Sequence, residues 1–543
     1  MASGIDNKSA SAGKGFLSGV SVLTLSAIAV KVIGLLYKIP LLSYLGTEGM
    51  GYFNTAYELY ALFCIISTAG LPVAMAVLIS GGKGNFGADR IYRASRAAFL
   101  VIGLLGSLVM YVFASRFADA LDNSGAALCL KAISPTVLFI CLGSAYRGYF
   151  QGKGNMLPTA VSQVIEAACK LGLGLMLGGY AVSRGQPMQV AAAYAVLGLT
   201  VGALLSAVYL SVSKAVSDRK SDTPQVGNGA KRGEILRELI LLALPITLSA
   251  MVTGSAKFID LATILSRLAD SGYSEAEANS LYGCYSTLVL PIFNILPSLT
   301  SSVSLSATPA ISSALARGEE GISDLKSTAR TSMGLVCAVA IPAAVGLAVF
   351  SRDILSLLFS SQPSAVITAT PWLSVMAAAV LPSCLITLSA GMLQAMGRAR
   401  LSLYTMLCGI ALKAVLAYAL IGNENIGVLG APVSSVACDT LVAAFNLFLV
   451  SRHCPQLLPR ARELIGLFLR PTAATAVAVG AVCIVRKKLE IENSSASTVL
   501  SILTVMLIYG ALMLIFTLKK HKGENNGIGN EKLNERGKAD LPS

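Results

Sequence analysis

Long apolar runs, separated by short polar segments, fill the chain from residue 17 to residue 518. A helix that crosses a membrane needs about 20 consecutive, mostly apolar residues. By this rule the pattern predicts an all-α polytopic membrane protein with about fourteen transmembrane helices. The predicted spans lie near 17–43, 53–80, 95–116, 125–147, 157–182, 190–213, 238–266, 283–315, 331–358, 366–395, 400–421, 426–450, 466–486 and 496–518.

The longest internal polar segment, 215–235, follows six predicted spans and precedes six more. We interpret it as a linker between two six-helix repeats that share one orientation. The last two spans have no counterpart and are expected to be additional helices. The expected parts are a cytoplasmic N-terminal tail (1–16), an N-terminal six-helix bundle (17–214), the cytoplasmic linker (215–235), a C-terminal six-helix bundle (236–452), two additional transmembrane helices (466–518) and a disordered cytoplasmic tail (519–543).

A faint internal repeat supports this duplication. The stretch from Arg147 to Lys170 matches the stretch from Gly391 to Lys413 at an offset of 243 residues. Each copy has a short basic turn, an apolar run and a lysine at the same place inside that run. A lysine in the middle of a membrane helix needs a compensating partner or water. The repeat therefore predicts a duplicated framework around a charged cavity.

The loop charges predict the orientation of the chain. With a cytoplasmic N-terminus, the inside loops carry nineteen Lys and Arg residues and the outside loops carry seven. Lys and Arg concentrate in the cytoplasmic loops of membrane proteins. An even number of spans then places both termini in the cytoplasm.

Composition separates this chain from soluble proteins. Hydrophobic residues make up 55% of it, charged residues only 13%, and the mean hydropathy is +0.70, whereas a soluble domain averages about 25% charged residues. The formal net charge is +14, but much of it lies in loops and tails that set orientation, so no nucleic-acid partner is expected.

The chain lacks the usual signatures of catalytic and metal sites. Its eleven cysteines form no CxxC pair, and its two histidines, His453 and His521, lie in loops or tails. No GxxxxGK[ST] phosphate loop, HExxH or DxD motif is present. We therefore expect no catalytic residue, no metal site and no cofactor, and transport is the favoured function.

Charged residues inside the predicted spans are the candidate functional groups. Each costs about 2.5–3.5 kcal/mol at the centre of a span unless water or a partner compensates it. Six bases against four acids leave an excess of two positive charges, which favours an anionic ligand. The bases are Lys31, Lys38, Lys131, Lys170, Lys257 and Lys413, and the acids are Glu58, Glu166, Asp260 and Asp439.

Helix geometry predicts which of these groups pair. Residues three or four apart share a helix face, and side chains near the same end of adjacent spans can meet. The predicted pairs are Glu166 with Lys170, Lys257 with Asp260, and Lys38 with Glu58. Arg147 lies at the cytoplasmic end of its span, where it is either a positive-inside anchor or a cavity residue. Snorkelling of a lysine towards the headgroups is the alternative to a cavity position, above all for Lys131.

Four stretches carry a family resemblance. They read KVIGLLYKIPLLSYLGTEGMGYFNTAYELYALF, GLPVAMAVLIS, RGYFQGKGNMLPTAVSQVIE and LYGCYSTLVLPIFNILPSLTSSVSLSATPAIS. The chain resembles the stage V sporulation protein B and polysaccharide-biosynthesis membrane protein family of the multidrug/oligosaccharidyl-lipid/polysaccharide exporter superfamily, which includes lipid II flippases. The resemblance covers the chain up to about residue 518. It implies a fourteen-helix fold with a V-shaped central cavity, in the bacterial plasma membrane.

The resemblance also implies a role for individual residues. Lys31 resembles a basic residue that lipid II flippases place on their first helix, facing the cavity. Where those proteins have a further arginine on this helix, this chain has Tyr37 followed by Lys38, and their second-helix arginine has no clear equivalent. We infer that the phosphate-binding set is redistributed. The candidate diphosphate-binding residues are Lys31, Lys38, Lys170, Lys257, Lys413 and Arg147, and the candidate charge partners or gating residues are Glu58, Glu166, Asp260 and Asp439.

The implied function is that of a flippase for an undecaprenyl-diphosphate-linked cell-wall precursor, with lipid II as the leading cargo. Its energy source would be the membrane potential or an ion gradient, and its partners the lipid-linked oligosaccharide, membrane lipid and cell-wall synthesis enzymes. The alternatives are export of another lipid-linked glycan, cation-coupled multidrug antiport, and a non-transporting scaffold for cell-wall enzymes. The lysine excess disfavours a pump for cationic drugs, and a scaffold leaves the buried charges unexplained.

Overall fold

The structure is a computed structural model that describes residues 3–80, 87–219, 232–459, 461–488 and 496–516. Over these residues the chain consists of helices and turns and contains no strand. The predicted all-α class is therefore confirmed. The tail 519–543 and most of the linker 215–235 lie outside the described residues, and α1 begins at Ser3, within the predicted N-terminal tail.

The described residues form eighteen α-helices. They are α1 (Ser3–Ile65), α2 (Leu71–Ser80), α3 (Ala88–Val112), α4 (Ala114–Asp119), α5 (Ala127–Gly152), α6 (Leu157–Ser183), α7 (Met188–Arg219), α8 (Arg232–Asp270), α9 (Glu275–Cys284), α10 (Leu290–Ala316), α11 (Ile322–Val349), α12 (Ser351–Leu358), α13 (Pro363–Met376), α14 (Val380–Ala395), α15 (Ala399–Ile421), α16 (Gly430–His453), α17 (Ala461–Lys488), and a final helix at Ala496–Phe516.

Thirteen helices among the described residues are long and apolar enough to cross a membrane, against fourteen predicted spans. The difference lies at Gly46, where φ is 63° and ψ is −175°. This residue interrupts α1, so that the first predicted span and the first half of the second are counted together as Ala29–Ile65. A straight helix of that length would reach about 55 Å, well beyond the roughly 30 Å of a bilayer core. The second predicted span continues through the π-helix Ile66–Gly70 into α2.

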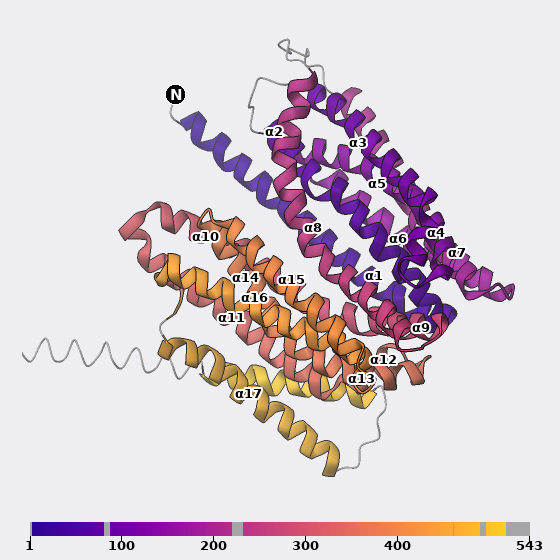
Figure 1. Cartoon of the computed structure of the whole chain (residues 1–543). Helices are drawn as coiled ribbons and strands as arrows, with labels where there is room; N and C mark the ends of the chain where they lie inside the picture. The colour runs from indigo at the N-terminus through magenta and orange to yellow at the C-terminus, as the bar shows by residue number, and fades with distance from the viewer. Residues whose placement is uncertain (1–2, 81–86, 220–231, 460, 489–495, 517–543) are drawn as a thin grey trace, which may run out of the picture. The chain divides into compact units, whose positions relative to one another are not determined.

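The chain packs into two compact units. Unit 1 comprises Met1–Pro291, Ser361–Ala369 and Met406–Ser434, and unit 2 comprises Ile292–Ser360, Thr370–Thr405 and Ser435–Ser543. These units follow packing contacts and differ from the two predicted bundles, whose boundaries stay predictions. In unit 1, α3, α5, α6 and α7 lie side by side (Figure 1).

Unit 2 attaches the additional helix α17 through both apolar and ionic contacts. Val479 and Val482 of α17 pack with Phe350 and with Val505 of the final helix. Arg486 Nη1 lies 2.6 Å from Asp353 Oδ2 of α12. The additional helices are therefore fixed to unit 2 by their own core and one partly buried ion pair.

The internal repeat is visible in the backbone of two turns. Gly154, after α5, has φ of 75°, and Gly397, after α14, has φ of 70°. The Gly154 amide donates to Gln151 O and the Gly397 amide to Gln394 O, both at 2.9 Å. A glycine with positive φ that closes a helix in this way is a common C-terminal motif. The sequence echo therefore reflects two turns of the same geometry.

Two glycines set the distance between α1 and α9. A Cβ atom on Gly283 would meet the Thr47 carbonyl oxygen and would lie 2.7 Å from the Gly51 amide nitrogen. Both are backbone atoms that cannot rotate away. The crossing therefore leaves no room for a side chain at Gly283, and it brings the polar side chains of α9 against α1.

We predict that Gly283→Ala destabilises the protein by about 1–3 kcal/mol, because overpacking at a tight contact displaces backbone. The thermal midpoint of the purified protein in detergent should fall. Gly172→Ala is the matched control, because a Cβ atom there meets no atom within 4 Å. Equal midpoints for the two variants would contradict the close crossing.

Candidate functional site

The charged side chains of unit 1 come from five of its helices. Lys31, Lys38 and Glu58 lie on α1, Arg147 on α5, Glu166 and Lys170 on α6, Lys257 and Asp260 on α8, and Lys413 on α15. All of these belong to unit 1, so their mutual geometry is defined. Asp439, on α16, belongs to unit 2 and is not placed with them.

Arg147 is neutralised by a carboxylate from the neighbouring helix. Its Nη2 lies 3.0 Å from Glu166 Oε2 and donates to Ser206 Oγ at 3.1 Å, while its Nε donates to Ser162 Oγ at 3.0 Å. The predicted pairing of Glu166 with Lys170 is therefore wrong. The guanidinium fork satisfies several acceptors at once, so it outcompetes the lysine one turn along α6. Arg147 then ties α5, α6 and α7 together, and its predicted role towards a diphosphate stays untested.

Lys413 forms the most deeply buried ion pair of unit 1. Its Nζ lies 2.8 Å from Asp260 Oδ2, and the two side chains are 7% and 2% exposed. The predicted pairing of Asp260 with Lys257 is wrong, because Asp260 points to α15 while Lys257 is exposed. Asp260 Oδ1 has no hydrogen-bond partner among the described residues. This pair joins α8 to α15.

Lys38 is held by neutral polar groups. Its Nζ donates to Ser286 O at 3.1 Å and, more weakly, to Asn54 Oδ1 at 3.4 Å. The Asn54 amide in turn donates to Ser286 Oγ and Thr287 Oγ1. The predicted ion pair with Glu58 is not formed, although Glu58 lies within electrostatic reach of Lys38. Among the described residues, no carboxylate therefore contacts Lys38 directly.

Buried amides extend this polar contact along α1 and α9. Asn279 donates to Glu48 O at 2.7 Å, and Asn123 donates to Thr55 Oγ1 and to Asn279 Oδ1 at 2.9 and 2.8 Å. Thr47 and Ser280 share a further hydrogen bond at 2.5 Å. Of the side-chain oxygens of Asn123 and Asn279, that of Asn279 accepts a hydrogen bond, whereas Asn123 Oδ1 has no partner among the described residues. Buried polar contacts of this kind favour one arrangement of their helices. The network therefore holds the part of α1 around Thr47 and Glu48 against α9.

Lys170 faces aromatic rings. Its Nζ lies 4.6 Å from the ring centre of Tyr57, 5.2 Å from that of Tyr37 and 6.0 Å from that of Phe53. Among the described residues it makes no ion pair or hydrogen bond. Ring faces attract a cation by about 0.5–2 kcal/mol, but they do not neutralise it. Lys170 is therefore a second half-buried, uncompensated cation.

Lys31 and Lys257 are exposed on α1 and α8 and lie within electrostatic reach of each other. Lys257 is also within reach of Lys38, and Lys38 of Lys170. The four lysines and Glu58 form what we call the lysine cluster. Four ammonium groups against one carboxylate leave it a net charge of +3. Beside the pairs Arg147–Glu166 and Lys413–Asp260, the lysine cluster thus carries a surplus of positive charge.

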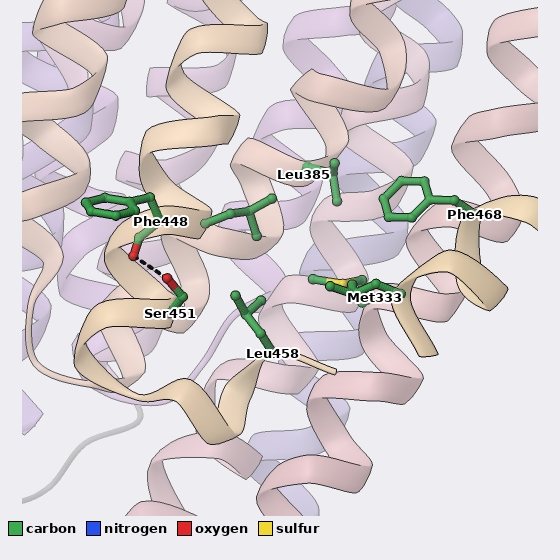
Figure 2. Close-up of a pocket in the computed structure, with 8 residues that line it drawn as sticks. Met333, Leu385, Phe448, Ser451, Leu458 and Phe468 are labelled. Atoms are coloured by element: carbon green, nitrogen blue, oxygen red, sulfur yellow. Dashed lines mark hydrogen bonds between the residues drawn. The ribbon is translucent and has the colours of Figure 1, made fainter. Parts of the chain in front are cut away.

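A pocket in unit 2 has the opposite character. Its volume is about 270 Å³, and its lining residues are Met333, Leu385, Leu447, Phe448, Ser451, Leu458, Leu464 and Phe468 (Figure 2). The one polar side chain, Ser451, donates to Phe448 O at 2.7 Å. No charged residue lines this pocket, so it suits hydrocarbon and not a diphosphate.

Sequence reasoning missed the neutral half of the site. It singled out the charged residues but not Asn54, Asn123 and Asn279, nor Tyr37 and Tyr57. Asparagines within apolar runs were an available signal, because a buried amide needs partners. The aromatic surroundings of Lys170 come from another helix and left no local signal.

Comparison with known proteins identifies the family of this chain. A family profile described as polysaccharide biosynthesis protein matches residues 16–315, more than half of the sequence. The chain belongs to the polysaccharide biosynthesis protein family. A second profile, MatE, matches residues 286–419.

Two named relatives align with most of this chain. Stage V sporulation protein B of Bacillus subtilis (strain 168) is 25% identical over 452 residues, covering 81% of this chain and 84% of that protein. Lipid II flippase MurJ of the same organism is 26% identical over 421 residues, covering 74% and 76%. The relatives are named as a flippase and a sporulation protein, and none of these names is that of an enzyme.

Solved structures confirm the fold of the polysaccharide biosynthesis family member. Lipid II flippase MurJ in an inward closed conformation superposes with a TM-score of 0.70 at 14% identity, covering 92% of this chain and 99% of that chain. A multidrug resistance MATE family transporter in an inward-facing conformation gives 0.60 at 15% identity, covering 80% and 98%. The protein is thus a multi-pass bacterial membrane transporter with a MurJ/MATE-like fold. The orientation of its termini and the V-shaped cavity stay predictions.

We predict that Lys413→Met lowers the free energy of unfolding by about 3–5 kcal/mol, because it leaves Asp260 charged and buried without a partner. The double variant Lys413→Met/Asp260→Asn should regain most of that loss. Thermal unfolding of the wild type, both single variants and the double variant measures the coupling. Additive losses would show that the ion pair does not hold α8 to α15.

Proposed function

We propose that this protein is a flippase for a lipid-linked cell-wall precursor. The observation that carries the proposal is the lysine cluster, with its net charge of +3 inside the spans of a polysaccharide biosynthesis family member. Charges inside a membrane protein are costly and mark ligand pathways when they are not fully paired. Arg147 and Lys413, the other two candidate diphosphate-binding bases of unit 1, are each paired with a carboxylate, Glu166 and Asp260.

The diphosphate group of a polyprenyl-linked sugar fits this cluster. It carries two negative charges, and ammonium groups bind phosphate oxygens as point charges. In the poorly solvated interior each such contact is stronger than in water. Lys31 and Lys257 are exposed and so accessible to the diphosphate, while Lys38 on α1 and Lys170 on α6 are half-buried.

Lipid II is the cargo we propose within this class. One relative at 26% identity is named a lipid II flippase, and the other is a stage V sporulation protein. Another lipid-linked glycan would present the same diphosphate, so the cluster alone does not distinguish them. Rescue of a lipid II flippase deletion by this chain is the experiment that separates the two cargos.

Multidrug antiport is the second candidate, because the MatE profile matches residues 286–419 and MATE structures share the fold. A site for cationic drugs needs a surplus of carboxylate, and unit 1 has the opposite charge. The positive net charge of the lysine cluster therefore favours an anionic cargo. Drug efflux by this chain, unaffected by loss of the lysines, would reverse that preference.

We propose that the membrane potential contributes to the driving force. Moving one charge across the membrane is worth about 2.3 kcal/mol per 100 mV. The outward movement of a negatively charged head from a negative interior is downhill. An ion gradient remains an additional source, and binding to cell-wall synthesis enzymes is a further part of this proposal.

We predict that Lys31→Met/Lys257→Met lowers the rate at which lipid II reaches the outer leaflet by about tenfold or more, because each charge-assisted contact contributes about 1.5–3 kcal/mol. The measurement is the labelling of lipid II by a probe added outside cells that depend on this chain. Lys31→Arg should retain more activity than Lys31→Met, because it keeps the charge.

The matched control is Lys326→Met, which removes an exposed lysine near the start of α11. It should leave the labelling rate unchanged. Wild-type labelling in the Lys31/Lys257 double variant would count against the lysine cluster as the diphosphate site.

A further inference from the structure

The lysine cluster divides into two pairs along α1. Lys31 and Lys257 are both exposed, and no carboxylate contacts either of them among the described residues. Lys38 and Lys170 are both half-buried. Lys31 and Lys38 are seven residues apart, so about 10 Å of helix separates the two levels. We call Lys31 and Lys257 the exposed pair, and Lys38 and Lys170 the half-buried pair.

Glu58 lies on the turn of α1 that both half-buried lysines contact. Asn54, which accepts from Lys38 Nζ at 3.4 Å, is four residues before Glu58 and so shares its helix face. Tyr57, whose ring lies 4.6 Å from Lys170 Nζ, directly precedes it. Glu166 acts electrostatically on Lys170 more strongly than Glu58 does, but the Glu166 carboxylate is paired with Arg147. Glu58 acts on both Lys38 and Lys170 and forms no ion pair with either.

The environment of Glu58 explains why it stays near both lysines without pairing. Lys38 is held by Ser286 and Asn54, and Lys170 by the three aromatic rings. Among the described residues Glu58 accepts no hydrogen bond. A carboxylate needed only to neutralise a buried cation would contact it directly, as Asp260 contacts Lys413 at 2.8 Å.

We propose that the two pairs are successive anion-binding positions and that Glu58 is a resident carboxylate that competes with the cargo for the second one. This inference rests on the proposed function and deepens it. The diphosphate binds first at the exposed pair, where no acid opposes it. It reaches the half-buried pair only against repulsion from Glu58.

This arrangement keeps the second position from trapping the cargo. A transported ion must bind strongly enough to be taken up and weakly enough to leave. Two half-buried ammonium groups with no acid nearby would hold a diphosphate tightly, because little water screens them. Glu58 lowers that affinity, so the cargo is released when the carrier opens to the other side.

The test uses the purified full chain and farnesyl diphosphate, a short isoprenyl diphosphate, as the probe in a direct binding titration. We expect Glu58→Gln to bind the probe about tenfold more tightly than the wild type, equivalent to about 1.4 kcal/mol. This gain in affinity for the probe should vanish when Lys170→Met is added to Glu58→Gln. It should persist when Lys31→Met is added instead. Asp324→Asn, which removes one exposed carboxylate of α11 that pairs with Arg317, should bind like the wild type.

Two further variants test the order of positions without altering Glu58. In the wild-type background, Lys31→Met should weaken probe binding about tenfold, whereas Lys170→Met should change it less than about threefold. The Lys170→Met variant should nevertheless slow outward movement of lipid II. Equal losses of affinity in the two variants would overturn the two-position order even if Glu58→Gln did not fold.

One binding result would refute the role of Glu58 alone, and a different result would also refute the proposed function. If the wild type binds the probe and Glu58→Gln binds it equally or less tightly while melting like the wild type, Glu58 is not a competitor and the flippase proposal stands. If neither the wild type nor any variant binds the probe, the diphosphate site itself is wrong, and this inference is overturned with it.

Discussion

A charged side chain in the membrane interior is stable only where an opposite charge, a hydrogen bond or water compensates for its lost hydration. Unit 1 meets this requirement in different ways for different lysines. Lys413 is neutralised by Asp260 at 2.8 Å, whereas Lys38 has only neutral oxygens and Lys170 only aromatic rings. The first kind of contact holds helices together. The second leaves a positive potential that an anionic ligand can use.

The packing of α1 makes the second kind of contact possible. Gly46 breaks α1 into two segments, so Tyr37 lies before the break and Tyr57 after it, with Lys170 against both. The glycine crossing with α9 then brings Ser286, just beyond that helix, within reach of Lys38. Local backbone features with no charge of their own therefore determine which lysines stay uncompensated.

Much of the fold was predictable because membrane spans are set by length and hydropathy. The positions of the helices, the family and the repeated turn at Gly154 and Gly397 all followed from local sequence. The ion pairs did not, because the prediction considered partners on one helix or near one membrane end. Glu166 and Asp260 each have a lysine within one turn, yet both pair with a base from another helix. Contacts between helices depend on rotation and crossing distance, which no local spacing encodes.

The ion pairs seen in the structure show where the surplus positive charge lies. A count over all predicted spans gives an excess of two positive charges without saying where it lies. In the structure the pairs Arg147–Glu166 and Lys413–Asp260 cancel within themselves. Of the five other lysines, four form the lysine cluster of unit 1 with Glu58, and this cluster has a formal net charge of +3. Because one fold serves both a flippase and drug transporters, the fold cannot select the cargo. The local sign of the charge can, since it attracts a diphosphate and repels a cationic drug across the same helices.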